Sequence, residues 1–283
     1  MQNVKQIWQE TAKRLEKIYD RREAESITYL LLEDVFNIKL ADVIAEESRG
    51  LDSEKLEELI GRLLNHEPIQ YVTEVADFYG RKFKISPGAL IPRPETEELI
   101  ELIVHKNELE KPRILDIGVG SGCIGISLSL EIGGIVYGTD TSKGAIQIAQ
   151  ENAKRLNAEI TVFQHDVLKD ELLQSELDIL VSNPPYIPEE DREHMNKNVL
   201  QHEPNIALFV PDSDPIVFYK RIATIGLISL KDGGKIYFEI HENFGKDVQD
   251  YLISLGYVDV AIHQDMQKKD RMISATNSTN KLL

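Results

Sequence analysis

Residues 113–122 read RILDIGVGSG, and this stretch is the clearest indication of the fold. An apolar run ends at Asp116, glycines follow at positions 118, 120 and 122, and a helical stretch begins after them. Glycine lets a chain turn tightly and brings bare backbone close to a ligand, and a helix N-terminus offers free N–H groups. The stretch is therefore typical of a nucleotide-binding loop. The alternative is that the glycines serve only a tight turn.

The segments that follow alternate between strand-like and helical patterns. Seven short apolar runs predict strands: RILDIG, IVYGTD, ITVFQHD, LDILVSN, KIYFEIH, YVDVAIH and RMISAT. Helical spacing separates several of them, as in residues 142–156 and 214–230. This alternation predicts an α/β, Rossmann-like fold with a mostly parallel sheet and helices on both faces. Ligands of such sheets bind beyond the carboxyl ends of the strands.

The N-terminal part has a different pattern, because its apolar residues follow helical spacing alone. Residues 1–70 predict a small helical-bundle domain, and Asp52 or Ser53 is a candidate N-cap for its last helix. Residues 71–95 predict a linker with a β-hairpin that turns near Tyr79–Gly80. Residues 96–283 then form the domain with the sheet, whose first helix starts near Thr96.

Two further aspartates follow predicted strands. Asp140 ends the second strand, where a carboxylate can hydrogen-bond both hydroxyls of a ribose; the alternative is an N-cap for the helix opening at Ser142. Asp166 follows the third strand, where it could meet the edge of an adenine; capping and surface placement are the alternatives. Cys123, the single cysteine, is expected to be a small helix residue, because no sequence neighbour would activate its thiol.

These features leave two classes of enzyme open. Residues 120–125, GSGCIG, match the dinucleotide-binding pattern G-x-G-x-x-G and are compatible with a dehydrogenase. The order DIGVGSG also suits a methyltransferase that uses S-adenosylmethionine, whose loop needs no room for a pyrophosphate.

Residues 182–187, SNPPYI, favour the methyltransferase. An amide or exocyclic amino nitrogen is a poor nucleophile, because its lone pair is delocalised into the adjacent π-system. The Asn183 side-chain oxygen and a backbone carbonyl at Pro184 could accept its two hydrogens and hold its lone pair in line with a methyl carbon. Tyr186 offers a face for stacking, and Pro184 and Pro185 keep the loop rigid. The alternative is a proline-rich turn that merely leaves the sheet.

Several segments resemble the release-factor glutamine methyltransferase family (HemK/PrmC type) of class I methyltransferases. They are EPIQYV, LIPRPETEELIE, ILDIGVGSGCIGISL, SNPPYI, EPNIAL and DRM, and they span nearly the whole chain. The resemblance implies methylation of the side-chain amide nitrogen (N5) of the glutamine in the Gly-Gly-Gln motif of bacterial class 1 peptide chain release factors. It also implies that residues 1–70 recognise the substrate and that Pro92 to Thr96 close over the active site.

The resemblance assigns roles to individual residues. Catalysis and substrate binding fall to Asn183, Pro184, Pro185 and Tyr186. Binding of S-adenosylmethionine, with S-adenosylhomocysteine as the product, falls to Gly118, Gly120, Gly122, Asp140 and Asn183. Their positions in the sequence make Asp116, Val119, Ser121 and Asp166 further candidates for binding the cofactor. The sequence departs from the family at Val167 and Leu168, where some members carry a tryptophan near the adenine, and at His241, where glycine is usual.

Composition limits the partners. The formal net charge of −16 at pH 7 disfavours nucleic acid, whose phosphates need a basic surface. The apolar runs are too short for a membrane span, and residues 1–20 lack a signal-peptide pattern, so we expect a cytoplasmic protein without a membrane partner. The seven histidines lack metal-ligand spacing, so no metal is expected.

Two alternatives for the substrate remain: a glutamine of a ribosomal protein, or an exocyclic amino group in nucleic acid.

Overall fold

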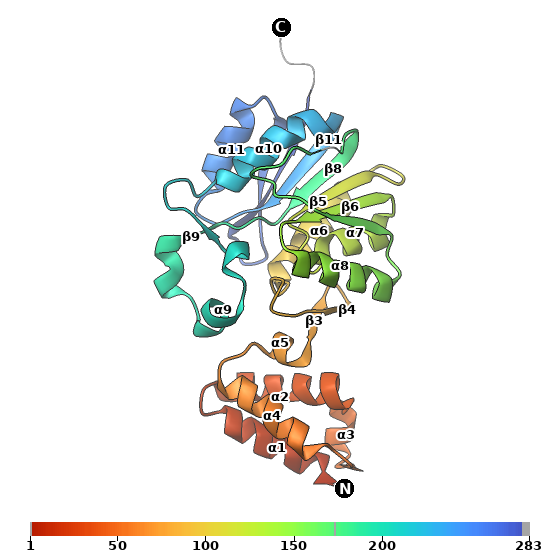
Figure 1. Ribbon diagram of the computed structural model, residues 1–283, viewed down its shortest axis with the longest axis vertical. Helices are drawn as coiled ribbons and strands as arrows, with labels where there is room; N and C mark the ends of the chain where they lie inside the picture. The colour runs from red at the N-terminus through yellow and green to blue at the C-terminus, as the bar shows by residue number, and fades with distance from the viewer. Residues whose placement is uncertain (1, 173, 279–283) are drawn as a thin grey trace. The chain divides into compact units, whose positions relative to one another are not determined.

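The computed structural model describes residues 2–172 and 174–278 (Figure 1). The chain forms two compact units. The first, here called the helical unit, holds the residues up to Val75 with Ile85–Pro87 and Asn196–His202. The second, the sheet unit, holds Ala76–Lys84, Gly88–Met195 and the residues from Glu203 onward. The predicted roles of residues 1–70, 71–95 and 96–283 remain predictions.

The helical unit is built from short helices around its own apolar core. It contains α1 (Val4–Leu15), α2 (Arg21–Phe36), α3 (Leu40–Ile44), α4 (Ser53–Leu64), α5 (Ile69–Thr73), α9 (Lys197–His202) and the antiparallel pair β1 (Gln2–Asn3) and β2 (Ser48–Arg49). The side chains of Asn3, Asp20 and Asp52 cap α1, α2 and α4 by accepting a backbone N–H three residues ahead. The predicted cap at Asp52 is therefore confirmed. Leu15, Leu31, Ile60 and Leu63 are fully buried in the core.

Residues 71–85 differ in part from the prediction. The expected first strand is wrong at its start, because Tyr71 to Thr73 belong to helix α5, which begins after Pro68 and buries Tyr71 and Val72. The hairpin itself consists of β3 (Val75–Phe78) and β4 (Arg81–Lys84). Its turn at Tyr79–Gly80 is confirmed, and both turn residues have positive φ, 49° and 69°, as a tight hairpin turn requires.

The sheet unit contains a seven-stranded sheet in the order β12-β13-β11-β8-β5-β6-β7. The strands are β5 (Arg113–Ile117), β6 (Ile135–Asp140), β7 (Ile160–Gln164), β8 (Leu177–Ser182), β11 (Leu230–Glu239), β12 (Val258–Gln264) and β13 (Asp270–Thr276). Each lies within or overlaps one of the seven predicted runs. The two pairs that β13 forms, with β11 and β12, are antiparallel and the other four pairs are parallel, so the mostly parallel sheet is confirmed. The strand order reverses between β5 and β8, which is where sheets of this kind bind ligands.

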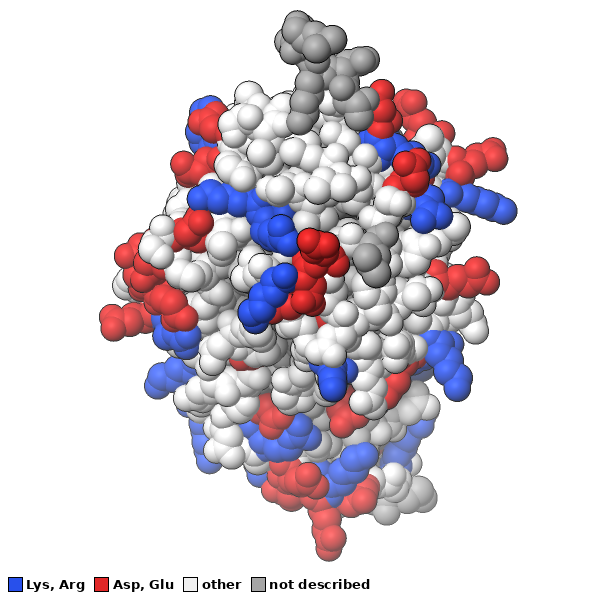
Figure 2. Space-filling view, turned by 45° about the horizontal axis from the view of Figure 1, so that its top comes forward, with Lys and Arg blue, Asp and Glu red and all other residues white. Residues whose placement is uncertain are grey.

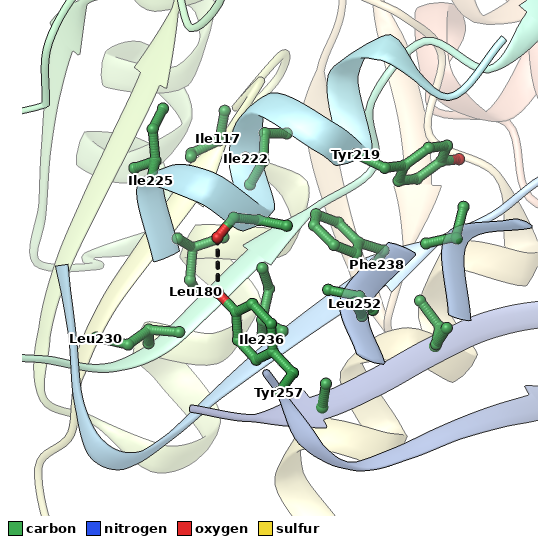
Figure 3. Packing of buried hydrophobic residues seen from close by; sticks show 14 of the residues in the cluster. Ile117, Leu180, Tyr219, Ile222, Ile225, Leu230, Ile236, Phe238, Leu252 and Tyr257 are labelled. Atoms are coloured by element: carbon green, nitrogen blue, oxygen red, sulfur yellow. Dashed lines mark hydrogen bonds between the residues drawn. The ribbon is translucent and has the colours of Figure 1, made fainter. Parts of the chain in front are cut away.

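Helices cover both faces of this sheet (Figure 1). Helices α6 (Pro94–Lys106) and α7 (Cys123–Ile132) pack on the face that carries Ile114. Helices α10 (Val217–Ser229) and α11 (Gly245–Ser254) pack on the face that carries Leu115. Figure 3 shows this second core, in which Ile222 and Tyr219 of α10 lie over Ile236 and Phe238 of β11. Alternate residues of one strand thus face opposite helical layers, as the period of a strand dictates.

The remaining elements of the sheet unit are short, apart from α8 (Lys143–Leu156). The short elements are the parallel pair β9 (Ile187–Pro188) and β10 (Phe209–Val210), and 3-10 helices at Glu189–His194 and Asn205–Ala207. Among the described residues, we find no helix with the length and apolar character needed to span a membrane.

Candidate functional site

The glycine loop follows β5 and is held open by backbone hydrogen bonds. Gly118, Gly120 and Gly122 have φ values of 78°, 53° and 85°, in the left-handed region that favours glycine. The N–H groups of Gly118 and Val119 both donate to the carbonyl of Thr139, at 2.8 Å, which ties the loop to the end of β6. A Cβ built on Gly118 would meet no described atom within 4 Å, so there is open space beside the loop.

Gly122 has a different reason for being glycine. A Cβ there would lie 2.7 Å from Cδ1 of Ile126 and 3.3 Å from Cα of Ala149, so the position also permits close packing of α7 against α8. Gly122 is thus required by packing, whereas Gly118 borders open space and its contact with a cofactor remains a prediction.

Asp140 lies at the tip of β6, as predicted, and binds the glycine loop. Its Oδ2 accepts the N–H of Gly120 at 3.0 Å, and its Oδ1 accepts the N–H of Ser142 at 2.9 Å. The cap of α8 is Ser142, whose side chain accepts the N–H of Ala145, so the alternative role of Asp140 as N-cap is wrong. Burial raises the pKa of Asp140, and its hydrogen bonds from backbone N–H groups oppose that shift.

Asp116 lies beneath the glycine loop. Its side chain is fully buried, and Oδ2 accepts the N–H of Gly125 at 2.9 Å. Oδ1 has no hydrogen-bond partner among the described residues, and burial raises the pKa of this carboxyl to about 7. This geometry favours a role in shaping the loop. Val119 and Ser121 are also buried, and their contact with a cofactor remains a prediction.

Two other residues near the loop have defined surroundings. Burial raises the pKa of the Cys123 thiol to about 12, so the thiol is protonated at neutral pH and is not activated as a nucleophile. Asn152, fully buried on α8, donates to the carbonyl of Ser121 at 2.8 Å and pairs with both backbone groups of Lys84. It thereby connects the loop to β4, and sequence reasoning missed it.

Asp166 follows β7 and binds its own turn. Its Oδ1 accepts the N–H of Leu168 at 3.1 Å, and its Oδ2 accepts Nζ of Lys169 at 2.7 Å. The hydrogen bond from Lys169 holds the pKa of Asp166 below its usual range. No helix lies between Asp166 and β8 in the described residues, so Asp166 caps a turn and no helix, and the contact with an adenine remains a prediction.

The SNPPYI stretch begins where β8 ends, at Ser182. Ser182 pairs with Ile117 of β5, and its hydroxyl donates to the Ile117 carbonyl at 2.7 Å. Ile117 and Ser182 are paired at the carboxyl ends of adjacent parallel strands. Gly118 follows the first of these residues and Asn183 follows the second. Because Pro184 and Pro185 stop the ladder, the loop leaves the sheet at this point, as the sequence predicts.

Asn183 and Tyr186 both connect to one buried carboxylate. Nδ2 of Asn183 donates to Oγ1 of Thr96 at 3.2 Å, and that hydroxyl donates to Oε2 of Glu239 at 2.6 Å. The hydroxyl of Tyr186 donates to Oε1 of Glu239 at 3.1 Å. Thr96 lies in the first turn of α6 and Glu239 ends β11, so these hydrogen bonds join α6 and β11 to the loop that follows β8.

Burial dominates the electrostatics of this network. It raises the pKa of Glu239, while the hydroxyls of Thr96 and Tyr186 and the charge of Arg271 lower it. Burial and the nearby Glu239 raise the pKa of Tyr186, which therefore keeps its proton and acts as a donor. Sequence reasoning missed Glu239. The signal available was a single acidic residue at the end of an apolar strand, the same pattern that identified Asp140.

His241 packs beside the ring of Tyr186. The two ring centroids are 5.9 Å apart in an edge-to-face arrangement, and His241 also lies 5.1 Å from the ring of Phe244. Burial lowers the pKa of His241, so its ring is neutral at neutral pH. His241, which departs from the family pattern, therefore packs between the rings of Tyr186 and Phe244.

The segment before α6 is tied to the chain that follows α9. Arg93 forms an ion pair with Glu203 at 2.7 Å, and the Ile91 N–H donates to the same carboxylate at 3.3 Å.

Within the described residues, no group of three or more His, Cys, Asp or Glu side chains is arranged to hold a metal ion.

Comparisons with known proteins match both units. The family model of the PrmC N-terminal domain matches residues 6–73, and that of the methyltransferase small domain matches residues 95–205. A crystal structure of a methyltransferase from Pyrococcus furiosus shares the fold, with a TM-score of 0.53 at 15% identity, over 77% of this chain and 97% of that chain. The predicted class I methyltransferase fold is confirmed.

Two relatives are similar along almost their full length. A release factor glutamine methyltransferase from Bacteroides thetaiotaomicron is 42% identical over 266 residues, which cover 92% of this chain and 95% of that protein. Another, from Flavobacterium psychrophilum, is 38% identical over 92% of this chain and 94% of its own. The chain belongs to the family of release factor glutamine methyltransferases.

Proposed function

We propose that the chain transfers a methyl group from S-adenosylmethionine to the side-chain amide nitrogen (N5) of the glutamine in the Gly-Gly-Gln motif of bacterial class 1 peptide chain release factors. The observation that carries this proposal is the position of Asn183. Its loop follows β8 beside the glycine loop that follows β5, because Ser182 and Ile117 are paired. The loop that we propose to bind the amide thus follows a strand paired with the one before the glycine loop, and membership of the family supports the choice of substrate.

The residues around the glycine loop fit the cofactor. The open space beside Gly118 leaves room for the methionine and ribose part against the backbone of residues 118–122. The carboxylate of Asp140 accepts the backbone N–H groups of Gly120 and Ser142, and a carboxylate has further lone pairs with which it could accept the ribose hydroxyls. Asp166 would meet the adenine. When bound, S-adenosylmethionine supplies an electrophilic methyl group.

The loop of Asn183 would hold and orient the glutamine amide. Oδ1 of Asn183 and the backbone carbonyl at Pro184 would accept the two hydrogens of the substrate nitrogen, which turns its lone pair toward the methyl group. The same acceptors stabilise the positive charge that develops on the nitrogen. Tyr186 would stack on the planar amide, and Pro185 keeps the loop rigid. The nitrogen can lose its extra proton to water after transfer, so no general base is needed.

The helical unit would recognise the protein substrate, and Pro92 to Thr96 would close over the active site. We place the enzyme in the cytoplasm, where release factors act. Nucleic acid is the less favoured substrate because of the net charge of −16.

The test is transfer of labelled methyl from S-adenosylmethionine to purified, unmethylated release factor. The matched control is a release factor in which Gly-Gly-Gln is changed to Gly-Gly-Ala, and structured RNA and a ribosomal-protein mixture are parallel substrates. We expect label on the wild-type factor alone. Label on RNA or on a ribosomal protein in place of the factor would contradict the proposed substrate, and equal labelling of the two factors would contradict the proposed glutamine.

A further inference from the structure

Glu239 is a buried carboxylate that the family motifs leave without a role. It is 1% exposed at the end of β11, and each of its oxygens accepts one hydroxyl. Thr96 donates to Oε2, and Tyr186 of the SNPPYI stretch donates to Oε1. The charge of Arg271 favours the ionised form of Glu239, against the effect of burial. An ionised carboxylate can only accept hydrogen bonds, so both hydroxyls then act as donors.

Counting protons then determines the orientation of Asn183. The hydroxyl of Thr96 has one proton, which it donates to Glu239, so its oxygen can only accept from its other neighbour. That neighbour is the Asn183 amide, at 3.2 Å. The end of the amide that faces Thr96 must therefore be the NH₂ group, and Oδ1 must be the end that faces away. With Glu239 ionised, this assignment follows from donor count and does not depend on telling nitrogen from oxygen by position.

We infer that Glu239 and Thr96 are positioning residues, which fix the Asn183 amide with its oxygen toward the substrate and fix the Tyr186 ring through its hydroxyl. The inference rests on the proposed function, in which the substrate nitrogen needs an acceptor and an NH₂ group at that place would repel it. The carboxylate is essential to the arrangement because only a group with two acceptor oxygens can take both hydroxyls. A glutamine at 239 would present an NH₂ group to one of them.

The first test compares two variants of similar size at one position. Thr96→Val keeps the shape of the side chain and removes the hydroxyl, whereas Thr96→Ser keeps the hydroxyl. We expect Thr96→Val to lower kcat by roughly 10- to 100-fold, the range typical of residues that orient another functional side chain. The KM for the release factor and the Kd for S-adenosylmethionine should change much less than kcat, because the Thr96 hydroxyl is occupied by Asn183 and Glu239 and acts through Asn183. Thr96→Ser should restore most of the activity.

Equal kcat values for Thr96→Val and Thr96→Ser would overturn the inference. Glu239→Gln gives an independent check, with an expected loss of kcat at least as large as that of Thr96→Val; wild-type turnover in this variant would also overturn it. Thermal unfolding and cofactor affinity of each variant separate a loss of orientation from a loss of folding.

The second test needs no substrate. In enzyme labelled with ¹⁵N-asparagine, the NH₂ signals of Asn183 are those absent from Asn183→Ala. The proton donated to Thr96 should be shifted downfield in the wild type and in Thr96→Ser, and this shift should be lost in Thr96→Val. If the wild type does not methylate the release factor but shows this pattern, the proposed function fails while the orientation of Asn183 stands. If the Asn183 signals are the same in all three proteins, the orientation is wrong, whatever the substrate.

Discussion

Replacing Asn183 by alanine removes the one side-chain acceptor proposed for the substrate nitrogen. By analogy with the loss of one donor from an oxyanion hole, turnover should fall by roughly 10²- to 10³-fold. The measurement is kcat for methylation of the release factor, with thermal unfolding as the control for folding. Turnover near the wild-type value would contradict the role of Asn183.

A second prediction concerns the pH dependence of stability at Asp116. Its pKa is about 7 in the folded protein against an ordinary value of 3.8, so the folded state binds more protons than the unfolded state between these pH values. The free energy of unfolding should therefore fall as the pH rises through this window, by up to about 1.4 kcal/mol per pH unit from this group.

Asp116→Asn isolates this effect, because the asparagine oxygen can still accept the Gly125 N–H but cannot titrate. Urea unfolding from pH 4.5 to pH 7.5 should show a steeper decline for the wild type than for the variant. Parallel curves for the two proteins would show that Asp116 is not a protonatable group of raised pKa.

At the scale of elements, the glycine loop offers a matched pair of substitutions. Gly122→Ala places a Cβ at φ 85° and against Ile126 and Ala149, whereas Gly118→Ala meets only the strain of φ 78°. We expect losses of about 2–4 kcal/mol and about 1 kcal/mol in the free energy of unfolding, respectively. Gly118→Ala should instead weaken cofactor binding more than stability, which calorimetry would measure. The reverse order of stabilities would contradict the assigned reasons.

The elements themselves could be predicted well from sequence. The strands of this sheet appear as short apolar runs between glycine, proline and acidic residues, and all seven runs contain strands. The short helix α5 could not be predicted, since five residues are too few for helical spacing to emerge. The same limit applies to the site: Asn183 and Asp140 lie in local motifs, but Thr96 and Glu239 are 143 residues apart and meet only through the packing of α6 beside β11.

For the whole molecule, the net charge indicates which kinds of partner it can bind. Acidic and basic side chains are interspersed on the face shown in Figure 2, and among its coloured residues neither sign forms a broad patch. With a net charge of −16, binding of a structured RNA hairpin at physiological salt should be weaker than about 10⁻⁴ M. Fluorescence anisotropy would measure it. Micromolar affinity with a steep dependence on salt would support the alternative in which the amino group of a nucleic acid is methylated.

The most direct test of the central claim is peptide mass spectrometry of a release factor incubated with the enzyme and S-adenosylmethionine. We predict the mass of one added methyl group on the peptide that contains Gly-Gly-Gln, with fragment ions that assign it to the glutamine side chain, and no such gain without the enzyme or with Asn183→Ala. An unmodified Gly-Gly-Gln peptide from the wild-type reaction, or a methyl group on another residue of the factor, would contradict the account.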